Sequence, residues 1–236
     1  MSFMKASIKP EDLQEGPSGS KYISKSGIYD VTLKITSVDV NDSGARSLNF
    51  NVEDEDGNET TFYGLKLENN DGSKNFEADV FNRLIIVANL EEVNDPEEQE
   101  HLLGKDKKPT TLAVLTDFDD LQCKIRVQEE YSKVPMGRGY KTEGQIKKKM
   151  VIKNFYRADG ASASEIVAEA TGDDSIKIGT QIEKDAPYAE NITYRDCTPE
   201  EVAAWKESKK TNAKPASGGA TPTLQNKPAG SLFNRK

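Results

Sequence analysis

The sequence predicts a mainly β fold, a small β-barrel with added helices. Apolar and polar residues alternate in several short segments, and turn-forming Gly, Asn and Asp residues separate these segments. One longer segment shows helical spacing of its apolar residues instead. The chain has 236 residues, enough to bury a sizeable core, but only 35% are hydrophobic and 31% are charged. We therefore expect part of the chain to remain unpacked.

The first three predicted strands follow one another closely. In residues 28–40 the apolar side chains are mostly two positions apart, which is typical of a half-buried strand. Residues 48–52 alternate cleanly between apolar residues and asparagine, and residues 59–67 form a third run. Turn signals at 41–44 and 54–58 join the three runs, so we expect an antiparallel meander.

A helix and two further strands are predicted next. Apolar residues between 76 and 90 recur at helical spacing, and this helix should pack on the sheet. Residues 91–100 read as an acidic connector that Pro96 interrupts. After an apolar segment at 112–118, alternation from Leu121 to Val127 predicts the fourth strand, and Met150, Ile152 and Phe155 supply a fifth.

This order of elements is the one expected of an OB-type barrel. That fold is a five-stranded Greek-key barrel, commonly with a helix between strands 3 and 4. An SH3-like barrel or an α+β sandwich predicts similar strands.

The ends of the chain differ from the middle. We interpret residues 1–25 as a flexible leader, 26–210 as the OB-fold-like domain with a C-terminal helical extension, and 211–236 as a disordered, acid-free basic tail. Within the extension, Ser162 and Glu165 form a capping-box pattern for a short helix. Pro199, after Thr198, begins a second helix that runs to about residue 210.

Residues 131–157 carry the most informative pattern of the sequence. They hold eight basic residues against one acid, a charge of +7, although the whole chain has a net charge of −8. The remaining residues therefore sum to −15 and would repel a polyanion elsewhere on the molecule. Tyrosine and phenylalanine are interleaved with the basic residues, and stacking rings beside phosphate-binding cations suit single-stranded nucleic acid. A solvated lysine-rich face is the simpler alternative.

The predicted DNA-binding residues lie in this region and on the third strand. On an OB barrel, strands 2 and 3 and the loop between strands 4 and 5 contact nucleic acid. Phe62 and Tyr63 should point to opposite faces, so one of them can stack on a base while the other fills the core. The hypothesis requires exposed rings and cations on one face. The full set is Tyr63, Lys66, Tyr131, Lys133, Arg138, Tyr140, Lys141, Lys147, Lys148, Lys149, Lys153, Tyr156 and Arg157.

The sequence contains few patterns that are typical of an enzyme. The single histidine, His101, lies in the acidic connector, and we predict no catalytic residue, no metal site and no cofactor. Asp117, Asp119 and Asp120 would suit a divalent ion, but a polar turn before the fourth strand is the favoured explanation. The two cysteines, Cys123 and Cys197, give neither a metal-ligand spacing nor a disulfide framework. With no apolar run of about 18 residues and no secretory signal, we expect a cytoplasmic protein that contacts no membrane.

Several short motifs along residues 26–210 resemble a family of phage-encoded single-stranded DNA-binding proteins, once catalogued as domain of unknown function 669. The matching segments are SGIYDV at 26–31, LNF at 48–50, FY at 62–63, NDG at 70–72, FNRL at 81–84 and IKNFY at 152–156. The resemblance implies an OB-fold that coats single-stranded DNA in phage replication, recombination or repair, in the host cytoplasm. Many such proteins end in an acidic tail that recruits replication proteins, whereas this tail is basic, which puts recruitment of that kind in doubt.

Three functions remain open from the sequence. The leading hypothesis is a non-catalytic protein that binds single-stranded DNA without sequence preference, with phage replication or recombination proteins as further partners. The second is a protein-interaction module or inhibitor that acts through its acidic surface. The third is a metal-dependent nuclease using the three aspartates. Neither the oligomeric state nor a preference for DNA over RNA follows from the sequence.

Overall fold

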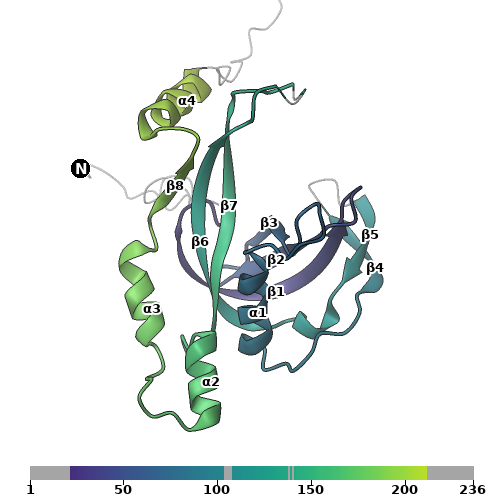
Figure 1. Cartoon of the computed structure of the whole chain (residues 1–236), viewed down its shortest axis with the longest axis vertical. Coiled ribbons are helices and arrows are strands. Elements are labelled where there is room, and N and C mark those ends of the chain that lie inside the picture. Colours follow the sequence, from purple (N-terminus) through teal and green to yellow (C-terminus); the bar gives the residue numbers. More distant parts are fainter. Residues whose placement is uncertain (1–21, 104–107, 138, 140, 212–236) are drawn as a thin grey trace, which may run out of the picture.

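The protein is mainly β. A computed structural model describes residues 22–103, 108–137, 139 and 141–211. These residues form eight strands in one open sheet, together with four α-helices (Figure 1). All strand pairs are antiparallel except the pair of β6 and β8.

The predicted meander is confirmed. It consists of β1 (Gly27–Val40), β2 (Arg46–Asp54) and β3 (Glu59–Lys66), in which β2 pairs with both neighbours. The alternation seen in the sequence is the alternation of burial, since Leu48, Phe50 and Val52 are almost completely buried. Asp54 closes the second turn by accepting hydrogen bonds from the N–H groups of Asp56 and Asn58, at 3.0 and 2.9 Å.

The fourth and fifth predicted strands exist but are much longer than predicted. They are β6 (Gln122–Lys133) and β7 (Ile146–Arg157), which pair with each other along their whole length. The first half of β6 also pairs with the start of β1. The other halves of β6 and β7 continue beyond β1 to β3 as a long ribbon, and β8 (Ile192–Arg195) pairs with β6 there (Figure 1).

The acidic connector between helix and fourth strand was predicted wrongly. After α1 (Ala78–Val87) the chain forms a hairpin of β4 (Glu97–Leu103) and β5 (Lys108–Val114), and β5 joins the end of β1. Acidic residues have low strand propensity, so the sequence pattern did not indicate β4. A 3-10 turn at Thr116–Phe118 then places Phe118 in the core.

The sheet is not the closed five-stranded barrel that was predicted. β3 pairs only with β2, and β7 pairs only with β6, so no backbone ladder joins β3 to β7 among the described residues. Side chains pack across this gap instead. Phe50 and Phe62 meet Ile152 there and leave a cavity of only about 10 Å³, enough for at most one water molecule.

The C-terminal extension wraps around β6 and β7. It contains α2 (Ala163–Thr171), α3 (Thr180–Asp185), a 3-10 turn (Ala186–Tyr188), β8 (Ile192–Arg195) and α4 (Pro199–Thr211). Both predicted helix starts are confirmed. The Ser162–Glu165 capping box is present, and Thr198 accepts a hydrogen bond from the N–H of Glu201 at 3.3 Å. The sequence patterns did not indicate α3 or β8.

One apolar core joins the sheet to α1 and α2. It contains Phe155 of β7, Leu84 of α1 and Ile166 of α2, with Phe50 and Phe155 in ring contact at 5.5 Å. The described chain is packed before residue 26, where we placed the end of the leader. Ile23 is buried, and its N–H donates to Thr60 Oγ1 at 2.8 Å. The rest of the leader, residues 1–21, and the predicted tail from residue 212 onward lie outside the described residues.

No helix among the described residues has the length and apolar character needed to cross a membrane.

Candidate nucleic-acid interface

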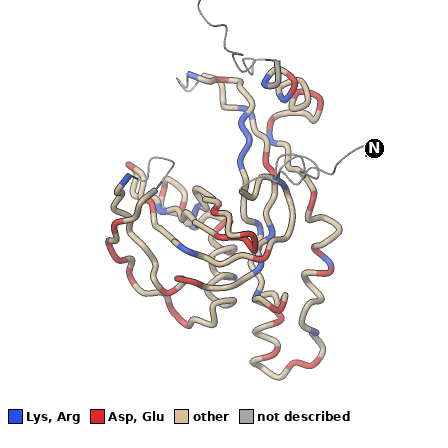
Figure 2. The backbone as a smooth tube through the Cα atoms, turned by 180° about the vertical axis from the view of Figure 1, so that it is seen from behind, with Lys and Arg blue, Asp and Glu red and all other residues tan. Residues whose placement is uncertain are grey.

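The lysines of β7 lie on two opposite faces of the β6–β7 ribbon. Lys148 is paired across from Tyr131, on the face that continues into the apolar core. Lys147 and Lys149 alternate with Lys148 and therefore lie on the other, outer face. Figure 2 shows this run of three lysines as a continuous basic stretch on the ribbon.

Lys147 and Lys149 keep their charge uncompensated. Both side chains are exposed, and no carboxylate of the described residues lies within ion-pair distance of either ammonium group. Lys149 Nζ donates to the carbonyl oxygen of Gly64 on β3, at 3.1 Å. This contact bridges the gap between β3 and β7 and brings a cation beside the exposed side of β3.

A bulge in β3 turns an aromatic ring outward next to Lys149. The register of β2 and β3 shifts near Gly64, whose φ of +70° is the left-handed conformation that favours glycine. Phe62 points into the core, whereas Tyr63 is 67% exposed, which resolves the alternative left open by the sequence. Lys66 is exposed on the same strand. We call Tyr63, Lys66, Lys147 and Lys149 the β3–β7 outer surface.

Four other predicted cations are neutralised by carboxylates. Lys148 contacts Glu129 at 3.2 Å, and Lys133 contacts Glu201 at 2.5 Å. Lys153 lies 3.7 Å from Glu130, and Arg157 bonds both Asp159 and Glu169, at 2.7 and 2.9 Å. Lys148 also donates to the carbonyl oxygen of Ser24 at 2.5 Å. These four predicted cations are therefore held in ion pairs, whereas Lys66, Lys147 and Lys149 lie on the outer surface.

Tyr131 cannot stack on a base in this structure, contrary to the prediction. Its ring is 1% exposed because Tyr194 of β8 stacks on it at 6.0 Å and Trp205 of α4 meets it edge-on at 6.1 Å. Its hydroxyl donates to Glu129 at 2.7 Å. Burial, followed by this hydrogen bond, raises the pKa of Tyr131 above its ordinary value.

Tyr156 is buried as well, so the prediction that it stacks on bases is also wrong. It has no exposed surface, and its hydroxyl donates to Asp185 of α3. Burial and then the hydrogen bond to Asp185 raise the pKa of Tyr156. Both tyrosines were assigned from their place in a basic segment, and the covering elements come from a part of the chain with weak sequence signals.

The loop between β6 and β7 contains three of the predicted DNA-binding residues. Lys141 is exposed in this loop. Arg138 and Tyr140, which were predicted to bind DNA, lie outside the described residues.

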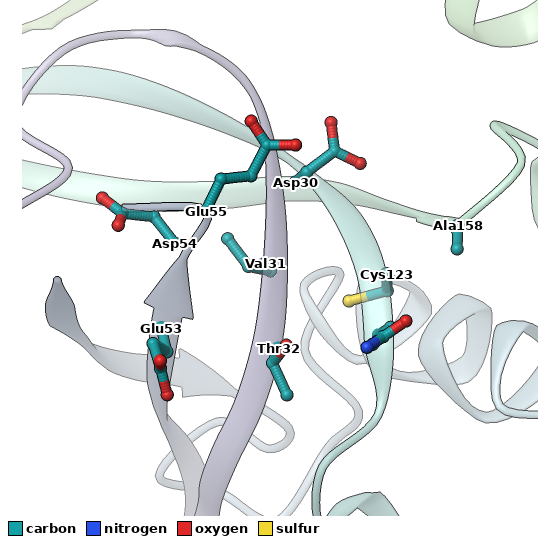
Figure 3. Close-up of a pocket in the computed structure, with 9 residues that line it drawn as sticks. Asp30, Val31, Thr32, Glu53, Asp54, Glu55, Cys123 and Ala158 are labelled. Atoms are coloured by element: carbon teal, nitrogen blue, oxygen red, sulfur yellow. The ribbon is translucent and has the colours of Figure 1, made fainter. Parts of the chain in front are cut away.

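An acidic pocket lies on another part of the sheet. It has a volume of about 250 Å³ and is lined by Asp30, Glu53, Asp54 and Glu55 (Figure 3). The carboxylates of Asp30 and Glu55 point to the same side in this view. Asp30 forms an ion pair with Lys124. This pocket repels a polyanion, and a strand that binds the protein would be directed away from it.

The aspartates considered for a nuclease do not converge. Asp117 accepts hydrogen bonds from the backbone and side chain of Asn94, at 2.8 and 2.7 Å, and Asp120 forms an ion pair with Lys34 at 3.0 Å. Within the described ranges no group of three His, Cys, Asp or Glu side chains could hold a metal ion.

Three cations outside the predicted set lie on or beside the outer face. Arg195 of β8 contacts Glu130 at 2.9 Å, Arg126 of β6 contacts Asp185 at 3.0 Å, and Arg83 of α1 reaches the backbone of β7. The sequence does indicate that Arg126 faces outward, because Lys124 and Arg126 alternate with the buried Cys123 and Ile125. Arg83 and Arg195 come from elements whose packing on β6 and β7 the sequence does not reveal.

A scan against models of known protein families gives no match, and a search of curated proteins gives none either.

Proposed function

We propose that this protein binds single-stranded DNA, without sequence preference and without catalysing a reaction, and that the β3–β7 outer surface is part of its binding face. The observation that carries the proposal is the position of two uncompensated lysines, Lys147 and Lys149, next to an exposed ring, Tyr63. Such a pair of features suits a phosphate backbone with unstacked bases.

The order of strand pairs supports an OB-type fold. β1 pairs with β2 and β6, β2 pairs with β3, and β6 pairs with β7, as strands 1 to 5 of an OB barrel do when the last contact stays open. On this interpretation the β4–β5 hairpin is an insertion after α1. Tyr63 then lies on the strand 2–3 face that OB-folds use for oligonucleotides.

The distribution of charge over the rest of the surface also favours binding at the β3–β7 outer surface. The β2 side chains beside Tyr63 include Asn49 and Asn51, which carry no charge. Acidic residues gather instead around the pocket of Asp30 and Glu55 and along β4. The chain carries a net charge of −8, so a strand would be attracted to few places on it. The resemblance to phage DNA-binding proteins points to replication or recombination proteins as further partners.

Titration with a fluorescent dT oligonucleotide tests the proposal, with duplex DNA as the comparison. Tyr63→Ala should weaken binding of the oligonucleotide about 5- to 150-fold, the equivalent of the roughly 1–3 kcal/mol that one stacked base contributes. Tyr22→Ala is the matched control, because Tyr22 is also exposed but lies beside Asp54 and Glu55. Equal losses in the two variants, or absence of binding by the unmodified protein, would refute the assignment. Degradation of the oligonucleotide in magnesium would indicate the nuclease instead.

A second candidate function, protein interaction, is favoured by the free edge of β4. Among the described residues β4 pairs with β5 alone, and it carries Glu97, Glu98 and Glu100 exposed along its length. An extended basic peptide could add a strand there, with ion pairs to the glutamates. Binding of a lysine-rich peptide without binding of the oligonucleotide would favour this candidate.

A further inference from the structure

A cavity of about 660 Å³ lies on the outer side of β6 and β7, below the lysine run. α1, α2 and α3 surround it, at the end of the ribbon opposite α4 (Figure 1). Three cations line it, Arg83, Arg126 and Lys153, against one carboxylate, that of Asp185. These four residues sum to +2, and Glu130, which contacts Lys153 at 3.7 Å from outside the lining, reduces the local surplus to +1. The net charge of the whole chain is negative.

The two arginines carry buried donors without acceptors. Arg83 donates from Nη2 to the carbonyl oxygen of Lys153 at 3.3 Å, but its Nε is buried and has no partner among the described residues. Arg126 contacts Asp185 from Nη1 at 3.0 Å and the carbonyl oxygen of Tyr188 from Nη2 at 3.4 Å. Its Nε is buried and lacks a partner in the described structure too. Asn154, which also lines the cavity, has a buried Oδ1 without a partner in the described structure. Buried polar groups are almost always satisfied, and two unmatched donors against one unmatched acceptor leave the cavity short of acceptors.

A bulge in β7 explains why Lys153 lines the cavity. Asn154 pairs with Arg126 and Ile152 pairs with Val127, so Lys153 is the extra residue between two successive pairs. The bulge leaves the Lys153 carbonyl oxygen available to Arg83 and lets its side chain lie on the outer face. Lys153 follows Lys149 by four residues on that face, about 13 Å along the strand.

The start of α2 adds small polar residues to the lining. Ser162, Ala163 and Ser164 line the cavity, and α2 begins at Ala163. The helix dipole places positive potential at the first N–H groups of a helix. Here the Ser162 hydroxyl accepts from the N–H of Glu165, and the carboxylate of Glu165 in the same turn offsets part of that potential. Ser164 also presents a hydroxyl group, 3.1 Å from that of Ser162.

We propose that this cavity is a phosphate-binding site. A tetrahedral oxyanion in the cavity can accept hydrogen bonds from the arginine and lysine side chains that line it, and its charge matches the sign of the surplus of cations. A water molecule could accept a hydrogen bond but would leave that surplus uncompensated. The phosphate can belong to a bound DNA strand, since the cavity continues the row of Lys147 and Lys149, or to a free nucleotide. The site itself depends only on phosphate chemistry and holds whether or not the protein binds DNA.

Calorimetric titration of the full-length protein with inorganic phosphate, in chloride buffer at constant ionic strength, tests this site. Arg83→Gln and Lys153→Gln should each weaken phosphate binding at least about tenfold, because each removes a charged donor. Asp185→Asn should strengthen binding several-fold, since it removes the only carboxylate among the four charged lining residues and can still accept from Tyr156. That gain cannot result from misfolding.

Lys34→Gln is the matched control, because Lys34 is a partly exposed cation of the same sheet, held by Glu53 and Asp120 away from the cavity. Phosphate binding that is absent in the unmodified protein, or equal in Lys34→Gln and Lys153→Gln, would overturn the proposal. Saturation with the dT oligonucleotide then identifies the source. Loss of phosphate binding assigns the site to the strand, and unchanged binding assigns it to a free phosphate ligand. Failure of the oligonucleotide to bind would remove the proposed function and leave the phosphate result intact.

Discussion

The salt dependence of DNA binding is the sharpest test of the β3–β7 outer surface. Each phosphate contact with a single strand contributes about −0.7 to the slope of log affinity against log salt concentration. If six of the eight cations in residues 131–157 bound phosphates, the slope would be about −4. The structure removes Lys133, Lys148, Lys153 and Arg157 from that number because each already contacts a carboxylate.

Two of the eight cations, Lys147 and Lys149, lie on the outer surface, and Lys66 of β3 adds a third. Their contribution to the slope is about −2, from roughly −0.7 per contact. Replacing Lys147 and Lys149 together by glutamine should therefore make the slope less steep by about 1.4. Contacts made by other parts of the chain, including Arg138, would add equally to both proteins. They do not change this difference, so the difference is the quantity to measure.

Lys148→Gln is the control, because Lys148 lies between the two lysines but points to the opposite face and contacts Glu129. It should leave the slope unchanged. Titrations with the dT oligonucleotide at four or more salt concentrations give the slopes. A double variant with the slope of the unmodified protein, or a Lys148 variant that loses as much, would refute the division of β7 into a binding and a structural face.

Three further predictions concern the folded structure itself. Burial raises the pKa of Cys123 to about 12, so a thiol-reactive dye at pH 8 should label Cys197 rapidly and Cys123 slowly in the native protein, and equal rates would contradict its burial. Glu165→Gln should lower the free energy of unfolding by about 2 kcal/mol at pH 7, measured in urea. Burial alone would raise the pKa of Glu165, but bonds from backbone N–H groups outweigh it and hold the pKa below the ordinary 4.5, so the difference between the proteins should shrink as the pH falls below that value. Tyr156→Phe should cost about 1 kcal/mol in the same assay, because Asp185 loses a donor, and an unchanged stability would show that the hydrogen bond contributes nothing.

Local patterns predicted the elements whose cause is local. The meander of β1 to β3 follows from alternation and from turn residues, and the starts of α2 and α4 follow from capping residues such as Ser162 and Thr198. The elements that were missed depend on distant partners. β4 is a strand because β5 pairs with it, although three of its seven residues are glutamate. β8 is only four residues long and is held by parallel pairing with β6.

The residues of the candidate site also divide into those that local patterns predict and those that depend on distant contacts. Alternation placed one of Phe62 and Tyr63 outside, and the structure identifies Tyr63 as the exposed residue. Nothing near Tyr131 in the sequence indicates that Tyr194 and Trp205 cover it, because these residues follow 63 and 74 positions later. An aromatic residue within a basic segment is equally suited to a stacking surface or to the packing of a later segment. Only the long-range contacts distinguish the two.

A cluster of positive charge in a sequence overstates the charge that is available for binding. Along β6, Glu129 and Glu130 point to opposite faces of the ribbon and contact Lys148 and Lys153 respectively. The +7 of residues 131–157 is therefore an upper bound on the charge available to a ligand. What remains for binding is set by acids that strand pairing and the C-terminal helices bring alongside. In an acidic protein this compensation is extensive, so cations without a carboxylate partner, as on the outer face of β7, are a stronger indication of a polyanion site than the number of lysines.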